Sequence, residues 1–462
     1  MNAAHPELIL SLPKDEGRPH HERPRAGRWP RPDLLAVLAV GLLGVSAGLW
    51  LVPGLAPALA GVALASLVIA WAALATPAAR TAPWSWRIAL GGLLATSFLA
   101  LYPSVDLDIS LPRLQGILLG VAAFGALLSW LNSEQRLSRA TAGLVVLVLL
   151  VSALGLVADW PSGGKGLALN AVYGQLPHWP GAVPYLEDRG LNPNKLAAPL
   201  AMLVPSAAAA GLFSRRRWQR IAWRFAALAL FGAVLLTQSR SAYLAVAAGV
   251  LLVLTVASRR FLLLLVPVLA LAAWLVVWSV GPRELVGDWP TPPMLGGGAG
   301  SLAAGRDAAD YSLSSRVQVW TLARAMVDDF PLTGIGLGTF PEVAQSLYGP
   351  AYSDVAPLFP EDAEVPHAHN LALQVALDLG VPGLGFFVLL TACLGAAARR
   401  AIAWAPSPQT RGLAAGAAAG LLTYYVFGIT DVIGPGEKPS ILYWLLAATV
   451  VACARLPRIE PD

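Results

Sequence analysis

Charge is scarce in this sequence. Only 13% of its 462 residues are charged, whereas 56% are hydrophobic, and soluble globular domains typically carry about 25% charged residues. This shortage excludes an ordinary soluble domain. Apolar runs of about 17 to 25 residues recur along the chain, and an α-helix needs that length to cross a bilayer. The sequence therefore predicts a polytopic α-helical membrane protein.

Cysteine is nearly absent as well. Cys393 and Cys453 both fall inside apolar runs, so the sequence predicts no disulfide framework. We also expect no cleavable signal peptide, because residues 1–33 form a polar tail rich in Pro and Arg. Such a tail is too hydrophilic to serve as the apolar part of a leader.

The predicted fold class is all-α, with about twelve transmembrane helices and both termini in the cytoplasm. The predicted spans are 34–52, 57–76, 87–102, 111–131, 141–158, 194–213, 222–237, 241–257, 261–281, 369–396, 410–430 and 440–455.

Five parts follow from these spans. Residues 1–33 form a cytoplasmic tail, and 34–281 contain the first nine transmembrane helices. Residues 282–368 form one large periplasmic loop subdomain, 369–455 contain the last three helices, and 456–462 form a second cytoplasmic tail.

Arginine clusters set the predicted orientation. Arg215–Arg217, Arg259–Arg260 and Arg399–Arg400 fall in short segments on the same side as the termini, and most acids fall on the other side. Segments rich in Lys and Arg stay in the cytoplasm. The net charge of +5 is therefore interpreted as a signal that faces anionic lipid, and we expect no nucleic-acid partner.

Arg240 lies in a tight outer turn, Thr237-Gln-Ser-Arg-Ser-Ala242, between two predicted spans. A cation at the membrane surface is expensive unless it reaches the lipid headgroups or meets an anion. Both interpretations stay open. In the functional one, Arg240 binds an anion such as phosphate, with Ser239 and Ser241 as further donors.

A second outer cation lies on a predicted amphipathic helix. Apolar residues recur at helical spacing between Ser314 and Asp329, which predicts a helix on the outer leaflet or against the bundle. Arg316 and Trp320 are four residues apart and share one face. They are either interfacial anchors or part of the same anion site. The glycine-rich segment Thr333–Thr339 is predicted to end the helix in a turn.

His367 and His369 directly precede the predicted span 369–396. Each is a structural histidine, a metal ligand or a general base. We favour the base for His369, because a neutral imidazole accepts a proton near pH 7. Asp378 is predicted to be a structural acid. Acids that would complete a metal site are Asp354, Glu361, Asp362 and Glu364, but no second His or Cys cluster accompanies them, and we predict no metal.

Several motifs together resemble bacterial O-antigen ligases and their polymerase relatives. His369-Asn370, nine residues and Gly380-Val-Pro-Gly383 resemble the family signature His-[Asn/Ser/Gln]-x9-Gly-x-x-Gly. The turn Gln238–Ala242 is similar to the arginine motif of that family. Arg316–Trp320, followed by a Pro-Leu-Thr-Gly stretch, and Asn192–Ala197 resemble further family elements. The resemblance covers roughly residues 190–435.

The resemblance implies a GT-C type glycosyltransferase of the bacterial inner membrane, with no cofactor. It would move a glycan from undecaprenyl diphosphate to a hydroxyl of lipid A–core, or of another glycan or protein, at the periplasmic face. His369 would deprotonate the acceptor, and Arg240 and Arg316 would bind the diphosphate. The sequence shows no pair of carboxylates that would form a covalent intermediate. We therefore expect a single displacement with inversion at the anomeric carbon. Supporting candidates are His367, Asn370, Lys195 and Trp320.

Other functions remain open. A polymerase or a protein O-oligosaccharyltransferase would share the donor site and differ in the acceptor. A transporter of lipid-linked glycans would carry ionisable residues deep within its spans and broken helices in symmetric positions. Here the charged groups cluster at one face. A non-catalytic scaffold would not need the outward arginines and histidines.

Overall fold

The computed structural model describes residues 34–75, 82–157, 193–237, 239–264, 311–355 and 365–457, and within these ranges the chain forms helices and loops. The predicted tail 1–33 lies outside the described residues, as do residues 158–192 and 265–310. From Ala39 onward the described residues belong to one compact unit.

Each predicted span except 261–281 coincides with an α-helix, and the predicted ends differ from the observed ones by at most seven residues. Of the exception, only the first residues are described, in a 3-10 helix. The first helices are α1 (Leu34–Trp50), α2 (Leu55–Ala75), α4 (Trp84–Leu99), α5 (Leu107–Trp130), α6 (Glu134–Val157) and α8 (Pro193–Phe213). They are followed by α9 (Arg217–Leu236), α10 (Arg240–Ala257), η1 (Arg259–Leu264), α13 (Tyr311–Asp329), α14 (Phe340–Leu347), α15 (Gly349–Val355), α16 (Leu371–Ala403), α17 (Pro408–Phe427), η3 (Lys438–Ser440) and α18 (Ile441–Arg455).

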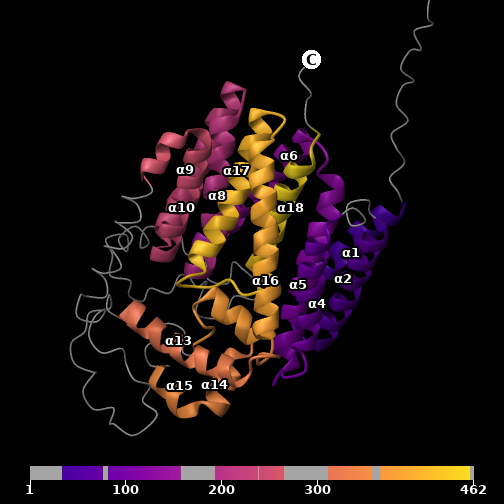
Figure 1. The fold of residues 1–462 in the computed structure, drawn as a ribbon, viewed down its shortest axis with the longest axis vertical. Coiled ribbons are helices and arrows are strands. Elements are labelled where there is room, and N and C mark those ends of the chain that lie inside the picture. The colour runs from indigo at the N-terminus through magenta and orange to yellow at the C-terminus, as the bar shows by residue number, and fades with distance from the viewer. Residues whose placement is uncertain are drawn as a thin grey trace, which may run out of the picture. The chain divides into compact units, whose positions relative to one another are not determined.

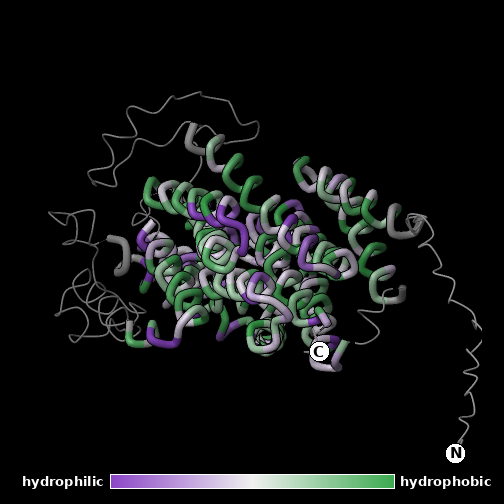
Figure 2. Tube along the Cα trace, turned by 90° about the horizontal axis from the view of Figure 1, so that it is seen from above, coloured by the Kyte–Doolittle hydropathy of each residue, from purple (hydrophilic) through white to green (hydrophobic). Residues whose placement is uncertain are grey.

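Among the described residues, 7 helices are long and apolar enough to cross a membrane, namely α2, α5, α6, α8, α9, α10 and α16. Figure 2 shows hydrophobic residues along the helices of the bundle. Leu147 on α6 and Phe225 on α9 are largely exposed. Large exposed apolar surfaces are unfavourable in water and expected against lipid. The count of twelve spans remains a prediction.

Small residues bring α8 and α17 into close contact. A Cβ atom on Gly420 would lie 2.6 Å from the carbonyl oxygen of Met202, and the Ser206 hydroxyl donates a hydrogen bond of 3.0 Å to the Gly416 carbonyl. Such contacts are typical of helix pairs in membranes, where backbones approach closely only over small side chains. The close contact fixes α8, which begins near the candidate site, against α17, which ends near it.

Three helices, α13 and the much shorter α14 and α15, lie across one end of the bundle (Figure 1). We call it the site end. The predicted amphipathic helix is confirmed as α13, and its Val319 and Met326 are fully buried. They form a separate hydrophobic cluster with Phe340 of α14, completed by Ala368 and Leu377. The short helices are therefore anchored on the beginning of α16.

A break in α16 receives the glycine-rich loop 331–338. Gly380 has φ 73° and ψ 172° and interrupts the helix. The freed Leu377 carbonyl accepts the Ile335 N–H at 2.7 Å, and the Val381 N–H donates to the Pro331 carbonyl at 2.7 Å. A Cβ atom on Gly380 would lie 2.3 Å from the carbonyl oxygen of Leu332. The loop is thus more than the turn that the sequence predicts, because it satisfies the backbone groups of the break.

Candidate functional site

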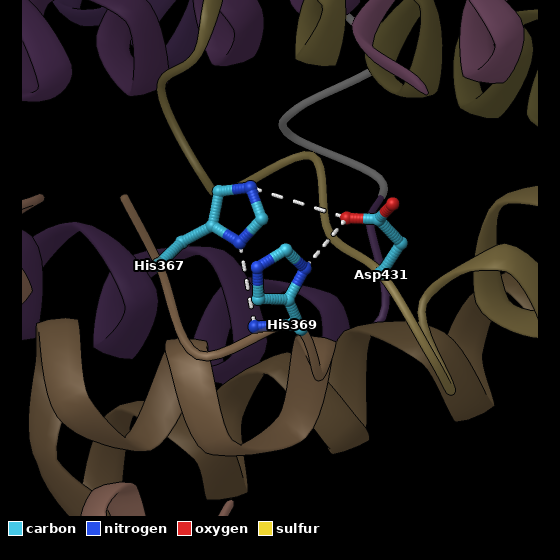
Figure 3. A group of neighbouring side chains, drawn as sticks. All are labelled: His367, His369 and Asp431. Atoms are coloured by element: carbon cyan, nitrogen blue, oxygen red, sulfur yellow. Dashed lines mark hydrogen bonds and ion pairs between the residues drawn. The ribbon is translucent and has the colours of Figure 1, made fainter. Parts of the chain in front are cut away.

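Two histidines and one aspartate meet at the site end (Figure 3). The Nδ1 atom of His369 lies 3.4 Å from Oδ1 of Asp431, and Nε2 of His367 lies 3.9 Å from the same oxygen. All three residues are buried, and the two imidazole rings are 4.2 Å apart between centroids. The cluster is therefore compact and shielded from solvent.

The start of α16 positions the histidines. The Asn370 side chain accepts from the Leu373 N–H at 3.1 Å and so caps the helix, while its Nδ2 donates to the Ile429 carbonyl at 3.0 Å. The Leu371 N–H donates to the Gly428 carbonyl at 2.7 Å. These bonds join the beginning of α16 to the end of α17. Asp431 lies four residues after that end.

His369 itself has a strained backbone. Its φ of 47° is positive, and non-glycine residues rarely adopt such a conformation. The Trp320 indole donates a hydrogen bond of 3.3 Å to the His369 carbonyl. Local strain of this kind persists where the surrounding structure determines it, and it is concentrated at functional sites.

Arg316 of α13 approaches the other oxygen of the aspartate. Its Nη2 lies 3.7 Å from Oδ2 of Asp431. Burial lowers the pKa of the Arg316 guanidinium, the Asp431 charge opposes this change, and the Arg240 charge adds to it. Arg240 is therefore close enough for the two cations to repel each other.

The charge states of the acid and of one histidine follow from their surroundings. Burial opposes ionisation of Asp431, but its hydrogen bond to His369 and the charges of His369, His367 and Arg316 outweigh burial and hold the pKa well below its usual range. Burial, and then the neighbouring His369, hold the pKa of His367 well below its ordinary value. At neutral pH the site contains an aspartate anion and an uncharged His367.

Hydrogen bonds select the imidazole tautomers. The backbone N–H of His369 donates to Nδ1 of His367 at 3.3 Å, so the proton of His367 is on Nε2, which faces Asp431. An ionised carboxylate only accepts hydrogen bonds. The proton of neutral His369 is therefore on Nδ1, toward Asp431, and its Nε2 carries the basic lone pair.

Two exposed cations flank the cluster. Arg240 is the first residue of α10, and the neighbouring Ser241 hydroxyl lies 2.8 Å from the Thr430 hydroxyl, next to Asp431. Lys195 is on the first turn of α8, and its charge contributes to the lowered pKa of His367. The structure thus brings the separate sequence motifs to one place.

A metal ion has three possible ligands here. The ligand atoms of His367, His369 and Asp431 all lie within 4.8 Å of one another. Among the described residues, the carboxylate beside the two histidines belongs to Asp431. It does not belong to the predicted Asp354, which is exposed on α15. The other acids named above, at 361, 362 and 364, lie outside the described residues. Arg316 already supplies positive charge at Asp431, which disfavours a metal cation.

Asp431 is the site residue that sequence reasoning missed. It directly follows Gly428-Ile-Thr, in the short segment after the predicted span 410–430 that also contains Glu437. An acid directly beyond a span is the only available signal, and it does not indicate a partner. Asp378, in contrast, is buried and hydrogen-bonded within α16, and its role as a structural acid stays a prediction.

The fold and the site together define a class. Apolar helices long enough to cross a membrane carry a buried histidine–aspartate pair with arginines at one end, which indicates a multi-pass membrane protein with a site for anion chemistry. Residues 225–388 match the model of a family described as O-antigen ligase. This match confirms the resemblance to the O-antigen ligase family over that segment and supports a ligase- or polymerase-type function. No curated protein matches the chain.

Proposed function

We propose that this protein is an O-antigen ligase. It transfers a glycan from undecaprenyl diphosphate to a sugar hydroxyl of lipid A–core at the periplasmic face, with inversion and without a metal. The observation that supports this most is the buried contact of His369 with Asp431 at 3.4 Å, beside Arg316 and Arg240. A base and cations are what such a transfer requires, because the diphosphate is already a good leaving group.

His369 is the proposed base. Asp431 holds the proton on Nδ1, so Nε2 takes the proton of the acceptor hydroxyl as its oxygen attacks the anomeric carbon. The bond between that carbon and the phosphate oxygen breaks, and its electron pair leaves with the diphosphate. Asp431 stabilises the imidazolium that forms, in the manner of the acid in a catalytic triad.

The cations stabilise the leaving group. Arg240 and Lys195 are exposed and so are available to phosphate oxygens, while Arg316 links the phosphates to the buried carboxylate. An arginine fork binds phosphate through two parallel hydrogen bonds. Negative charge that develops on the diphosphate is thus met by preorganised donors. His367, Asn370 and Trp320 support His369 through the contacts described above.

The first test uses purified wild-type protein and His369→Ala with a labelled glycan on undecaprenyl diphosphate and lipid A–core, followed by gel. Transfer of the label to lipid A–core by the wild type alone supports the ligase. A lengthening ladder on the carrier lipid indicates a polymerase with the same donor chemistry. Equal transfer by both proteins overturns the mechanism. His20→Ala, in the polar tail, is the matched histidine control.

The cation roles have their own test. Arg240→Lys and Arg316→Lys should each lose most transfer, because lysine cannot make the planar two-point contact. Arg324→Lys is the control on the same helix as Arg316, since the Arg324 side chain is 80% exposed and pairs with Asp328. Full activity of both site variants contradicts diphosphate binding by these arginines. Activity should also persist in EDTA.

A further inference from the structure

A buried hydrogen-bond chain reaches the histidine turn from within α16. Ala368, between the two histidines, is fully buried, and its N–H donates to Oε1 of Gln374 at 2.9 Å. The Nε2 of Gln374 donates to Oδ1 of Asp378 at 2.8 Å. Gln374 and Asp378 are each 3% exposed and one helical turn apart.

The chain continues into the glycine-rich loop 331–338. Oδ1 of Asp378 also accepts the Gly338 N–H at 3.1 Å, and Gly338 has φ 73°. This is the loop whose Ile335 N–H occupies the break in α16. The histidine turn, the first turns of α16 and the loop are therefore joined by consecutive hydrogen bonds.

Gln374 and Asp378 are polar side chains in a buried part of α16, where apolar residues are expected. Polar groups are costly in the interior unless they are hydrogen-bonded, and apolar residues would fill this part of α16 without that cost. Here Gln374 uses both ends of its amide, one toward Ala368 and one toward Asp378. The bond to Ala368 acts on the residue directly before His369, whose φ of 47° needs support from its surroundings.

We propose that Gln374 and Asp378 are positioning residues for the reaction. Through the Ala368 N–H they hold His369 in its left-handed conformation with Nδ1 toward Asp431, and they connect this turn to the glycine-rich loop. Neither residue touches the substrate. The inference rests on the proposed role of His369 as the base.

The first test is Gln374→Leu, which removes both hydrogen bonds at similar volume. We expect kcat to fall about 100-fold, because a displacement of about 1 Å at a catalytic group costs that much. The KM for the lipid-linked donor should stay unchanged, since the cations are not altered. Gln115→Leu is the matched control: Gln115 is also fully buried and hydrogen-bonded, to the Ser46 carbonyl, but far from the histidines in the chain.

The second test exchanges the two polar groups. Gln374→Glu alone places two carboxyl groups together, and Asp378→Asn alone replaces the carboxyl group whose oxygen accepts from both Gln374 and Gly338. In the double variant Gln374→Glu/Asp378→Asn, Glu accepts from Ala368 and from the Asn amide, whose oxygen accepts from Gly338. We expect the double variant to recover most of the kcat that Gln374→Glu loses. This rescue also provides a folded protein if Gln374→Leu does not fold.

The outcomes are distinct. Wild-type kcat in folded Gln374→Leu, next to an inactive His369→Ala, overturns the positioning role alone. A raised donor KM at unchanged kcat also overturns it, because the defect would then lie in donor binding. No recovery in the folded double variant contradicts the hydrogen-bond chain. Activity of His369→Ala overturns the proposed function and the positioning role with it.

Discussion

At the scale of the residue, three groups act on the His369 imidazole. Asp431 lies at Nδ1, the ring of His367 lies edge-on to it, and the Trp320 indole holds its carbonyl. These contacts set the tautomer, the ring orientation and the backbone conformation. If His369 is the proposed base, its orientation is preorganised and needs little rearrangement when an acceptor binds.

Asp431→Asn should be among the most damaging substitutions. An amide at this position can donate toward Nδ1 and favour the tautomer that leaves Nε2 protonated. We expect kcat to fall by about 10²- to 10⁴-fold, the usual contribution of general-base catalysis. Single-turnover transfer would measure the chemical step.

The control for this substitution is Asp328→Asn, because Asp328 is 70% exposed on α13. It should transfer at the wild-type rate. An active Asp431→Asn would contradict the role of the carboxylate in selecting the tautomer.

His367 makes stability dependent on pH. Its pKa in the folded protein is well below the ordinary value, chiefly through burial. As the pH falls through about 6.5, the unfolded chain therefore binds a proton that the folded protein does not. Stability should decrease from about pH 7 downward. The depressed pKa of Asp431 adds a further loss only near pH 4 and below.

Thermal melts of detergent-purified protein between pH 5 and 8 would measure this effect. His367→Gln should flatten the curve in the upper part of this range, whereas His20→Gln should leave it unchanged. An equally steep decrease in His367→Gln would assign the effect to other groups.

At the scale of the element, the break in α16 and the glycine-rich loop 331–338 depend on the same close backbone contact. Gly334 and Gly380 both have positive φ, and a Cβ atom on Gly334 would lie 2.2 Å from the Leu377 carbonyl oxygen. The glycines of loop 331–338 and Gly380 of α16 are therefore explained by the same contact between the two backbones. That contact orients the first turns of α16 and the histidines before them.

Gly380→Ala should destabilise the protein and reduce transfer. A positive φ costs about 1–3 kcal/mol in a residue other than glycine, and the added methyl group would press on the Leu332 carbonyl. Gly385→Ala is the matched control on the same helix, because no atom lies within 4 Å of its added Cβ.

The control should be neutral or slightly stabilising, since alanine is the better helix former by about 1 kcal/mol. Thermal melts and transfer assays of both variants would check this prediction. Equal stability of the two variants would show that the break tolerates a side chain.

At the scale of the molecule, the direction of α16 relates the site to the membrane. The helix begins at the site end and ends at Ala403, just before Trp404. If the site faces the periplasm, Leu347 on α14 lies outside and Trp404 lies toward the cytoplasm. Both side chains are more than half exposed, and the native Cys393 and Cys453 are buried.

Cysteine accessibility would test this orientation. In intact cells with a permeable outer membrane, a membrane-impermeant maleimide should label Leu347→Cys and not Trp404→Cys. Both should react after the cells are opened, which controls for exposure. The reverse pattern would contradict the predicted orientation.

Helix positions were predictable because a run of apolar residues forms its helix wherever it enters a bilayer. Predicted spans such as 241–257 and 440–455 differ from α10 and α18 by one residue. The candidate residues Arg240, Arg316 and His369 could also be predicted from the sequence, because polar groups at the ends of apolar runs stand out from their surroundings.

The sequence by itself determined the class, the long apolar helices and most residues of the candidate site. Only the tertiary structure decided that Asp431 faces His369 across 62 residues of chain, that loop 331–338 occupies the break in α16, and that Gln374 reaches back to Ala368. The reason is physical: helix formation depends on neighbours in the chain, whereas these contacts depend on which helices pack together and on the backbone conformation where they meet.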